Sequence, residues 1–264
     1  MEDGPYLSLV IPVYNEQENI PALVERVAAV LGELDRPFEV IICDDGSTDA
    51  TPRLLADGQR TYPWLRVLRM ARNGGQSAAF DAGFKAARGQ VIATIDGDLQ
   101  NDPEEIPRLI PMLDQDGGYD LITGWRKDRH DTQFRRLQTR VANRIRNWLS
   151  DENINDSACS LKVYRRRAVE GLQLYTGMHR FLPTLVKMRG FRVLETPVKH
   201  STRFAGTPKY GFRNRALRAF VDLLAVRWMK KRWLKYQVSE VTPTPTGAPS
   251  TPPAHLGGSL ASRV

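Results

Sequence analysis

The stretch Val91-Ile-Ala-Thr-Ile-Asp-Gly-Asp98 is the most informative part of the sequence about the fold. Its first five residues are mainly apolar and β-branched, which is the composition of a strand buried in a parallel sheet. Asp96, Gly97 and Asp98 follow at once, so two carboxylates stand at the carboxyl end of that strand. Open α/β sheets bind their ligands at this edge. The tripeptide alone also fits an ordinary turn, so its neighbours in the sequence decide between a turn and a binding site.

Strand-like and helix-like segments alternate on both sides of this stretch. The expected strands are 7–13, 38–43, 65–70, 91–95 and 119–123, and the expected helices are 16–34, a helix after 48, 76–87 and 103–113. Ser47 or Thr48 is placed to cap the second helix, with Pro52 in its first turn. Alternation with short connections predicts an α/β fold, in which helices cover both faces of a mostly parallel sheet.

The second half of the chain lacks this regular alternation and is richer in basic residues. Residues 126–149 form a strongly basic helical stretch, and short strands at 160–164 and 191–197 flank a helix near 181–188. A second basic helix is expected from 211 to 237. Beyond Val241 the sequence is rich in Pro, Thr and Ser, which predicts disorder.

Composition narrows the class of protein. With 264 residues, 41% of them hydrophobic, the chain suffices for one large α/β domain or at most two. Cys43 and Cys159 form no Cys-x-x-Cys pair, which excludes a disulfide scaffold and a thiolate zinc site. The N-terminus lacks a signal-peptide pattern, and no run of about 18 apolar residues occurs. We therefore expect a cytoplasmic or peripheral protein without a membrane span.

The balance of charge points to an anionic partner. The net charge is +8 and the isoelectric point is near 9.6. Such a surplus suits a nucleotide, a lipid phosphate, a membrane surface or a nucleic acid, although a merely solvated basic surface fits equally well. Nucleic-acid binding has no recognition motif to support it, so we expect no such partner.

Asp96 and Asp98 are typical of a divalent-cation site that serves a nucleotide diphosphate. Magnesium is usually held by one or two carboxylates together with phosphate oxygens of the ligand. A cation held there stabilises the negative charge that develops on a departing diphosphate. Two aspartates two residues apart divide this task, one reaching the metal and one the ribose or sugar. Gly97 between them permits a close approach of the backbone.

Companion motifs stand at neighbouring strand ends. Pro12-Val-Tyr-Asn-Glu16 follows the first strand, and Asp44-Asp-Gly-Ser-Thr-Asp49 follows the second. A tyrosine ring and a carboxylate at a strand end suit a nucleobase, and Asp45 is well placed for the base or the ribose. Carboxyl ends of parallel strands meet at one sheet edge, so the three motifs are expected to converge.

These motifs carry a resemblance to a known family. The chain resembles the inverting GT-A glycosyltransferases of family 2 over residues 7–125, through P-V-Y-N-E (12–16), D-D-G-S-T-D (44–49), R-N-G-G-Q (72–76) and D-G-D-L-Q (96–100). Over roughly residues 7–235 it is similar to the polyprenyl-phosphate sugar transferases, the dolichyl-phosphate mannose synthase group. That narrower likeness rests on D-G-D-L-Q-N-D-P-E-E-I-P (96–107), D-S-A-C-S-L-K-V-Y (156–164) and R-F-A-G-T-P-K-Y-G (203–211).

The resemblance implies roles for the matching residues. The implied nucleotide contacts are Pro12, Tyr14, Glu16, Asp45, Arg72, Gly75, Gln76 and Asp96, and the implied ligands of Mg²⁺ or Mn²⁺ are Asp96, Asp98 and Gln100. The implied clasp of the acceptor phosphate is Arg126, Arg135, Thr139, Arg203 and Lys209, and the catalytic residues are Asp96, Asp98 and Arg203. Arginine forks suit bidentate phosphate binding. Two positions depart from the family, since Thr139 replaces a serine and Pro208 removes a hydroxyl and an N–H donor.

The resemblance also implies the reaction. A hexose or N-acetylhexosamine leaves a UDP- or GDP-linked donor, with inversion, for the phosphate of a polyprenyl lipid on the cytoplasmic membrane face. That phosphate is mostly ionised at neutral pH because its second pKa is near 6, so no strong general base is needed. The implied domain plan has a GT-A catalytic domain at 1–211, with a nucleotide-sugar half at 7–125 and an acceptor half at 126–211. A basic amphipathic helix at 212–238 and a disordered tail at 239–264 follow.

The basic helix is the expected link to the membrane. It mixes Leu217, Phe220, Val221, Leu224 and Trp228 with Arg227, Lys230, Lys231, Arg232, Trp233 and Lys235. Basic residues beside interfacial aromatics suit an anionic membrane surface. Two alternatives stay open, in which the helix packs on its own core or docks on a separate small membrane protein. A homo-oligomer is a further open possibility.

Two other functions compete with lipid-phosphate transfer. A family 2 enzyme that adds sugar to a saccharide usually carries Gln-x-x-Arg-Trp, whereas Leu224 stands three residues before Arg227-Trp228 here. A non-catalytic nucleotide- or membrane-binding module is disfavoured by the intact metal and nucleotide motifs. Dinucleotide binding lacks its Gly-x-Gly-x-x-Gly fingerprint.

Overall fold

A computed structural model describes residues 4–127, 154–199 and 212–234, with the backbone alone for 212–219. The chain divides into two units, Met1–Trp233 and Leu234–Val264. The first unit holds every helix and strand given below. The predicted basic helix at 126–149 and the predicted disordered tail at 239–264 lie outside the described residues, apart from the first two positions of the former.

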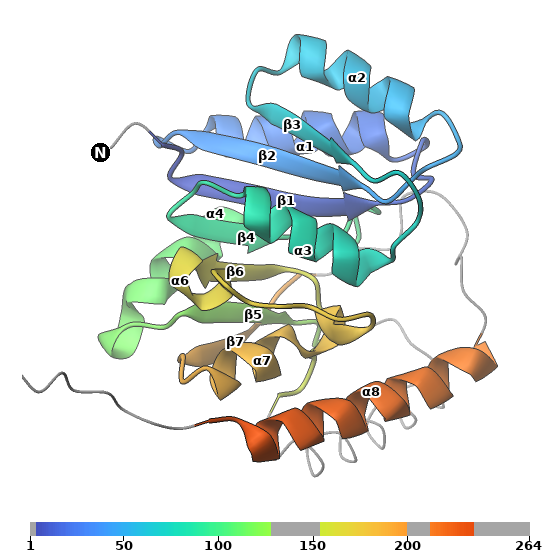
Figure 1. Ribbon diagram of the computed structural model, residues 1–264. Helices are drawn as coiled ribbons and strands as arrows, with labels where there is room; N and C mark the ends of the chain where they lie inside the picture. The colour runs from blue at the N-terminus through green and yellow to red at the C-terminus, as the bar shows by residue number, and fades with distance from the viewer. Residues whose placement is uncertain (1–3, 128–153, 200–211, 235–264) are drawn as a thin grey trace, which may run out of the picture. The chain divides into compact units, whose positions relative to one another are not determined.

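The fold is built on a seven-stranded mixed sheet (Figure 1). Its strands are β1 Leu7–Val13, β2 Phe38–Asp44, β3 Leu65–Arg69, β4 Val91–Thr94, β5 Leu121–Trp125, β6 Lys162–Arg165 and β7 Val193–Pro197. They lie in the order β3-β2-β1-β4-β6-β5-β7. β1 to β4 are mutually parallel, β6 is antiparallel to both of its neighbours, and β5 is parallel to β7.

Helices cover both faces of this sheet, as the sequence predicts (Figure 1). The α-helices are α1 Ile20–Gly32, α2 Thr51–Thr61, α3 Gln76–Ala86, α4 Glu105–Leu109, α6 Arg166–Val169, α7 Leu182–Met188 and α8 Phe212–Arg232. Two 3₁₀ helices, η1 Ile110–Gly117 and η2 Met178–Phe181, complete the set within the described residues.

Alternation along the strands divides the core between the two faces. Leu9 and Ile11 of β1 pack with α1, α2 and α4, whereas Val10 between them packs with α3, α6 and α7. Successive side chains of a strand point to opposite faces, so a strand buried on both sides is apolar throughout. This is why β1 reads as a continuous hydrophobic run in the sequence.

Several element boundaries differ from those predicted. α1 begins at Ile20 rather than residue 16, and the backbone N–H groups of Glu16 and Gln17 donate to the side chains of Thr51 and Asp49. The predicted helix at 103–113 is the short α4 followed by η1. The predicted Ser47 or Thr48 cap is wrong, because the helix begins at Thr51, whose N–H donates to Asp49. Pro52 does lie in the first turn.

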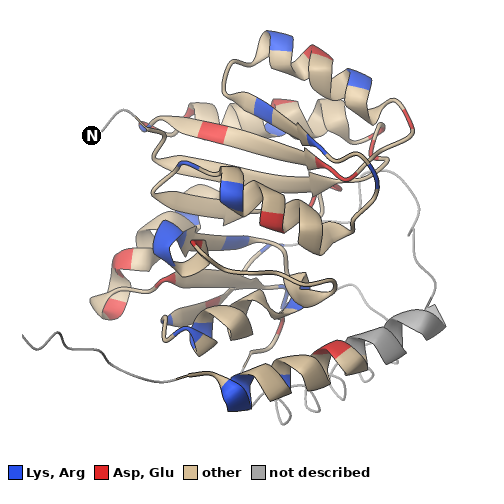
Figure 2. Cartoon of the chain, viewed as in Figure 1, with Lys and Arg blue, Asp and Glu red and all other residues tan. Residues whose placement is uncertain are grey.

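The C-terminal helix α8 has two apolar faces. Leu223 and Val226 are buried against Met178, Phe181 and Leu185. Val221, Leu224 and Trp228 are exposed, whereas the sequence alone leaves open whether this face packs on the core, on a membrane or on a partner. Lys and Arg gather at the C-terminal end of the helix (Figure 2). Among the described helices, none is long and apolar enough to cross a membrane.

Candidate functional site

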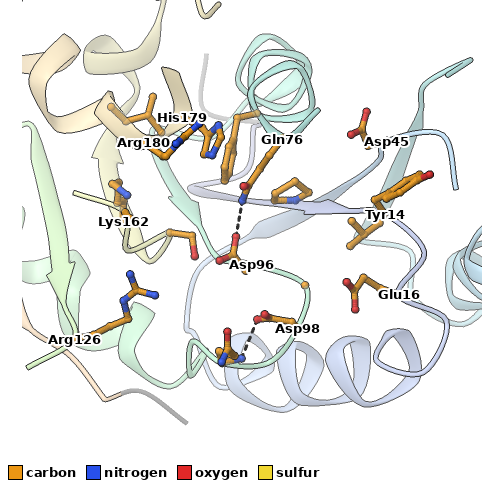
Figure 3. Close-up of a pocket in the computed structure, with 18 residues that line it drawn as sticks. Tyr14, Glu16, Asp45, Gln76, Asp96, Asp98, Arg126, Lys162, His179 and Arg180 are labelled. Atoms are coloured by element: carbon orange, nitrogen blue, oxygen red, sulfur yellow. Dashed lines mark hydrogen bonds between the residues drawn. The ribbon is translucent and has the colours of Figure 1, made fainter. Parts of the chain in front are cut away.

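The predicted motifs converge at the carboxyl edge of the parallel strands. Val13 at the end of β1 is paired with Asp44 at the end of β2, and β4 ends beside β1 directly before Asp96. A cavity of about 410 Å³ opens there (Figure 3). Its lining combines acidic, basic and apolar side chains: Pro12, Val13, Tyr14, Glu16, Asp45, Gln76, Phe80, Asp96, Gly97, Asp98, Gln100, Arg126, Ala158, Ser160, Lys162, His179, Arg180 and Leu182.

Asp96 lies at the centre of this cavity. Its carboxylate accepts a hydrogen bond of 2.8 Å from the side-chain amide of Gln76, the first residue of α3. Burial raises the pKa of Asp96 above its ordinary value, and the nearby charge of Asp98 raises it further. The Ser160 hydroxyl and the cations Arg126 and Lys162 oppose this shift. Two carboxylates close together destabilise each other's charge, which a bound cation would relieve.

The loop that carries the two aspartates is tightly bent. A Cβ atom added to Gly97 would lie 2.7 Å from Cγ1 of Val13, so a larger residue would not fit here without a shift of that side chain. Leu99 has a φ of 59°, in the left-handed region that L-residues rarely adopt. The Asp98 carboxylate accepts from the backbone N–H of Gln100 at 3.2 Å. The bend brings Asp96, Asp98 and Gln100 to one wall of the cavity.

These residues fit a divalent cation that is shared with a ligand. No group of three or more His, Cys, Asp and Glu ligands gathers anywhere in the described residues. Within the loop 96–100, Asp96 and Asp98 alone supply carboxylate oxygens, too few to saturate a cation. A cation there would complete its coordination with Gln100, water or ligand oxygens. Magnesium sites commonly have this composition, with one or two carboxylates plus substrate phosphates.

Asp45 belongs to a rigid part of the cavity wall. Its carboxylate accepts hydrogen bonds from the backbone N–H groups of Gly74 at 2.7 Å and Gly75 at 2.9 Å. Burial raises the pKa of Asp45, and the two N–H donors lower it. Gly46 beside it has a φ of 73°, and a Cβ there would lie 2.7 Å from backbone atoms of Arg72 and Asn73. The β2–α2 and β3–α3 loops are thus in direct contact.

The opposite wall of the cavity is basic. Figure 3 shows Arg126, Lys162 and Arg180 on one side of Asp96, with Asp45, Glu16 and Asp98 on the other. Arg126 is held by Asp156 in a bidentate pair, with Nε to Oδ2 at 2.7 Å and Nη2 to Oδ1 at 2.9 Å. Burial alone would lower the pKa of Arg126, but the hydrogen bonds and charge of Asp156 outweigh it and the net shift is upward. Arg126 is therefore permanently charged.

Lys162 is the deepest cation of this wall. The residue is 1% exposed, and its ammonium donates to the backbone carbonyl of Cys159. Burial lowers the pKa of Lys162, and the neighbouring Cys159, Asp156 and Asp96 partly restore it. A buried ammonium that faces a cavity is costly unless an anion compensates it. This makes Lys162 a candidate contact for an anionic ligand.

His179 and Arg180 reach the cavity from η2. The Nδ1 atom of His179 lies 2.8 Å from Oγ of Ser77, and the backbone N–H of His179 donates to the same hydroxyl at 3.1 Å. Ser77 follows Gln76 at the start of α3, so η2 is tied to the helix that contacts Asp96. The guanidinium of Arg180 lies 3.4 Å from the carboxylate of Asp222 in α8.

The structure brings together most of the sequence-predicted site. Pro12, Tyr14, Glu16, Asp45, Gln76, Asp96, Asp98, Gln100 and Arg126 all line the cavity. Arg72 is exposed and does not line it, and Gly75 contributes only an N–H to Asp45. Arg135, Thr139, Arg203 and Lys209 lie outside the described residues.

Sequence reasoning missed three basic residues of the lining. Lys162 belongs to a motif that supports the resemblance, D-S-A-C-S-L-K-V-Y, but that motif suggests no role for it. His179 and Arg180 stand in a segment without strong periodicity or a motif. The one signal available for Lys162 and Arg180 was the surplus of positive charge, which does not include His179.

Comparison with known proteins gives both a family and close relatives. Residues 8–172 match the family described as Glycosyl transferase family 2. A dodecaprenyl-phosphate galacturonate synthase of Rhizobium johnstonii is 40% identical over 232 residues, which covers 85% of this chain and 67% of that protein. An undecaprenyl-phosphate 4-deoxy-4-formamido-L-arabinose transferase of Edwardsiella ictaluri is 37% identical over 207 residues, 78% of this chain and 63% of its own. The chain thus spans about two thirds of these relatives.

Solved structures with little sequence identity share the architecture. A glucosyl-3-phosphoglycerate synthase from Mycobacterium tuberculosis, in complex with Mn²⁺, uridine diphosphate and phosphoglyceric acid, has a TM-score of 0.65 at 17% identity. The match covers 88% of this chain and 80% of that one. The mannosyltransferase PcManGT from Pyrobaculum calidifontis, in complex with GDP-mannose and Mn²⁺, has a TM-score of 0.55 at 18% identity, with coverages of 86% and 70%. These likenesses establish the fold.

Proposed function

The chain belongs to glycosyl transferase family 2 and has its GT-A fold, and on this premise we propose that it transfers a sugar from a nucleotide sugar to a polyprenyl phosphate. The observation that carries the proposal is the division of the cavity into an acidic wall and a basic wall. A nucleotide diphosphate with its cation suits the first wall, and an anionic acceptor suits the second. The relatives named for polyprenyl-phosphate products support the same acceptor class.

The donor side of the cavity is assigned to the strand-end motifs. Tyr14 and Asp45 are proposed to contact the base and the ribose, with Pro12 and Glu16 beside them. Asp96, Asp98 and Gln100 would hold Mg²⁺ or Mn²⁺. When bound, the cation stabilises the charge that develops on the leaving diphosphate. Gln76 donates to one Asp96 oxygen at 2.8 Å and so helps to orient this carboxylate.

The acceptor side is assigned to the basic wall. Arg126, locked in orientation by Asp156, is proposed to bind the acceptor phosphate together with Lys162. Arg135, Thr139, Arg203 and Lys209, which the resemblance also implies, remain proposals because they lie outside the described residues. The phosphate oxygen attacks the anomeric carbon from the face opposite the leaving group, which inverts the configuration. The catalytic role of Arg203, which the resemblance implies, is likewise a proposal.

An ionised acceptor explains why the cavity needs no dedicated general base. A phosphate monoester is mostly dianionic at neutral pH, whereas a sugar hydroxyl must lose a proton. Asp45 is tied to the N–H groups of Gly74 and Gly75, and Asp96 and Asp98 are assigned to the cation. Glu16 is assigned to the donor, so in the proposal each carboxylate that lines the described part of the cavity has another role, which is compatible with a phosphate acceptor.

The donor sugar is the least constrained part of the proposal. The resemblance implies a hexose or N-acetylhexosamine linked to UDP or GDP. The curated relatives are named for galacturonate and for 4-deoxy-4-formamido-L-arabinose. We therefore propose a nucleotide-linked sugar as the donor and leave its identity to a panel that includes an uncharged hexose, a uronate and an aminosugar.

The proposed place of action is the cytoplasmic face of a membrane. The relatives named for dodecaprenyl- and undecaprenyl-phosphate support a lipid-borne acceptor. The exposed apolar side chains of α8, Leu224 and Trp228 among them, stand beside the basic Lys230 and Lys231. This combination suits an anionic bilayer surface, with a small membrane protein or a second copy of the chain as other occupants. The division into a nucleotide-sugar half and an acceptor half also remains a proposal.

A direct transfer assay tests the proposed function. The purified chain is incubated with Mn²⁺, undecaprenyl phosphate in detergent and one radiolabelled donor at a time from the panel. We expect label to enter the lipid phase with at least one donor, and chelation of the metal to abolish the transfer. Binding of donors without any transfer to the lipid would instead favour a non-catalytic nucleotide-binding module.

A further inference from the structure

The 3₁₀ helix η2 lies between the cavity and α8. His179 and Arg180 line the cavity, whereas Met178 and Phe181 are buried in a cluster with Leu223 and Val226 of α8. Side chains of one short segment therefore contact the proposed active site and the C-terminal helix. A shift of α8 would move η2, and with it two basic residues of the cavity.

Asp222 places a charge at this junction. One of its carboxylate oxygens lies 3.4 Å from Nη2 of Arg180, and the two side chains are 21% and 23% exposed. The same carboxylate packs against Gly177, where an added Cβ would lie 2.3 Å from Oδ2. Gly177 also has a φ of 84°, which favours glycine. The carboxylate thus fits between the turn that begins η2 and the guanidinium.

The pair is not needed to attach α8. Leu223 and Val226 already pack the helix against η2 and α7 through Met178, Phe181 and Leu185. A partly exposed ion pair contributes only about 0–1 kcal/mol to stability. Loss of the pair should therefore change the stability of the fold little.

The other side of η2 is braced to the donor site. His179 contacts Ser77 through both its ring and its backbone N–H, and Gln76 next to Ser77 donates to Asp96. η2 is thus held against α3 through His179, and its next residue, Arg180, pairs with the carboxylate of Asp222 in α8. Its guanidinium faces the same cavity as Asp96 and Lys162 (Figure 3).

We propose that Asp222 is a positioning residue that orients Arg180 in the cavity, where Arg180 binds a phosphate group of a substrate. The inference rests on the proposed function, and it adds Asp222 of the C-terminal helix to the residues that serve this function. The phosphate belongs either to the donor diphosphate or to the lipid monophosphate. An arginine fork binds either group, and its orientation decides the strength of a bidentate contact.

Equilibrium binding to three variants tests the inference. Asp222→Asn keeps the shape of the side chain and removes its charge, Arg180→Gln removes the proposed contact, and the third variant combines both. Calorimetry with UDP or GDP and Mn²⁺ reports the donor diphosphate, and farnesyl phosphate reports the acceptor monophosphate. Asp81→Asn is the matched control, because Asp81 pairs with Lys85 at 2.6 Å outside the cavity lining. Thermal unfolding of each variant separates binding from stability.

We expect Asp222→Asn to weaken binding of one phosphate class by about tenfold, with Asp81→Asn unchanged. Arg180→Gln should lose more, and the double variant should match Arg180→Gln, because Asp222 acts through Arg180. Independent losses that multiply in the double variant, or unchanged binding of both phosphates by Asp222→Asn, would overturn the inference alone. If the wild-type chain binds neither phosphate class, both the proposed function and the inference are wrong.

Discussion

At the scale of single residues, the carboxylate of Asp45 holds a neighbouring loop and is also proposed to bind the ligand. The sequence places it after β2 and assigns it to the base or ribose. The structure adds that its oxygens accept the N–H groups of Gly74 and Gly75. A carboxylate has about four lone-pair sites, so two backbone donors leave capacity for a ribose hydroxyl.

Asp45→Asn should therefore weaken donor binding more than it slows turnover. The amide retains one acceptor oxygen and brings an NH₂ group against the Gly74 or Gly75 N–H, which misplaces the cavity wall. We expect KM for the nucleotide sugar to rise about tenfold and kcat to fall less than threefold, measured by initial rates. A fall in kcat alone, with KM unchanged, would show that Asp45 acts in the chemical step instead.

Glu39 makes a pH-dependent contribution to the fold. It is buried in β2 and accepts hydrogen bonds from the Ser8 hydroxyl at 2.6 Å and from the Arg88 backbone N–H at 2.8 Å. Burial by itself raises the pKa of Glu39, but these donors and Arg66 outweigh it, so the pKa lies below the ordinary 4.5. The ionised form thus stabilises the native state above the unfolded pKa, and this contribution is lost as pH falls through the lower folded pKa.

Glu39→Gln should consequently destabilise the protein most at neutral pH. We expect about 1–3 kcal/mol less stability than the wild type at pH 7 in urea unfolding. The difference should shrink as the pH is lowered below 4.5, because the unfolded chain binds a proton at this carboxyl before the native state does. A difference that is constant between pH 7 and pH 4 would contradict the ionised role of Glu39.

The sequence predicts the acidic wall of the site better than the basic one. Asp96 and Asp98 directly follow a buried strand, so local order in the chain already places them. Lys162 lies on β6 and Arg180 on η2, and both reach the cavity only through long-range packing. No local pattern encodes that β6 inserts beside β4.

At the scale of elements, the parallel half of the sheet is predictable and the mixed half is not. Alternating strands and helices with short links give β1 to β4 their parallel arrangement. In the second half, β6 lies antiparallel between β4 and β5, out of chain order. A strand of only four residues carries no local signal of its direction or of its neighbours in the sheet.

The contact between the β2–α2 and β3–α3 loops depends on Gly46. Its positive φ and the 2.7 Å approach to backbone atoms of Arg72 and Asn73 leave no room for a side chain. Gly46→Ala should cost about 1–3 kcal/mol in denaturant unfolding and weaken donor binding, because Asp45 is displaced with the loop. Gly32→Ala is the control, since a Cβ there meets nothing within 4 Å and should be neutral or slightly stabilising. Equal stability of the two variants would contradict the proposed loop contact.

At the scale of the whole molecule, α8 combines a buried face with an exposed apolar one. Trp228 is 64% exposed and Leu224 is 44% exposed, which water disfavours and a bilayer interface accommodates. Part of the surplus positive charge of the chain lies at the end of this helix (Figure 2). The sequence alone does not decide whether this helix packs on its own core or on a membrane. In the structure one face of α8 packs on the core, and the exposed face is the one proposed to contact the membrane.

Vesicle binding tests the exposed face of α8. The double substitution Leu224→Ser with Trp228→Ser should reduce co-sedimentation with anionic vesicles by about tenfold, with little change in thermal stability. Tyr175→Ser is the matched control, because Tyr175 is equally exposed but lies outside α8. Neutral phosphatidylcholine vesicles should bind the wild type more weakly than anionic ones. Unaltered binding by the double variant would assign the exposed face to a protein partner or a second copy of the chain.

The choice of acceptor tests the proposed function most directly, because a phosphate acceptor explains the basic wall and would itself need no dedicated base. Transfer of label from the active donor is measured to undecaprenyl phosphate and to undecaprenol, which differ only in the phosphate, with Asp98→Asn as the metal-site variant. We predict transfer to the phosphate alone, and a loss of about 100-fold or more in Asp98→Asn. Comparable transfer to the alcohol, or full activity of Asp98→Asn, would contradict the account.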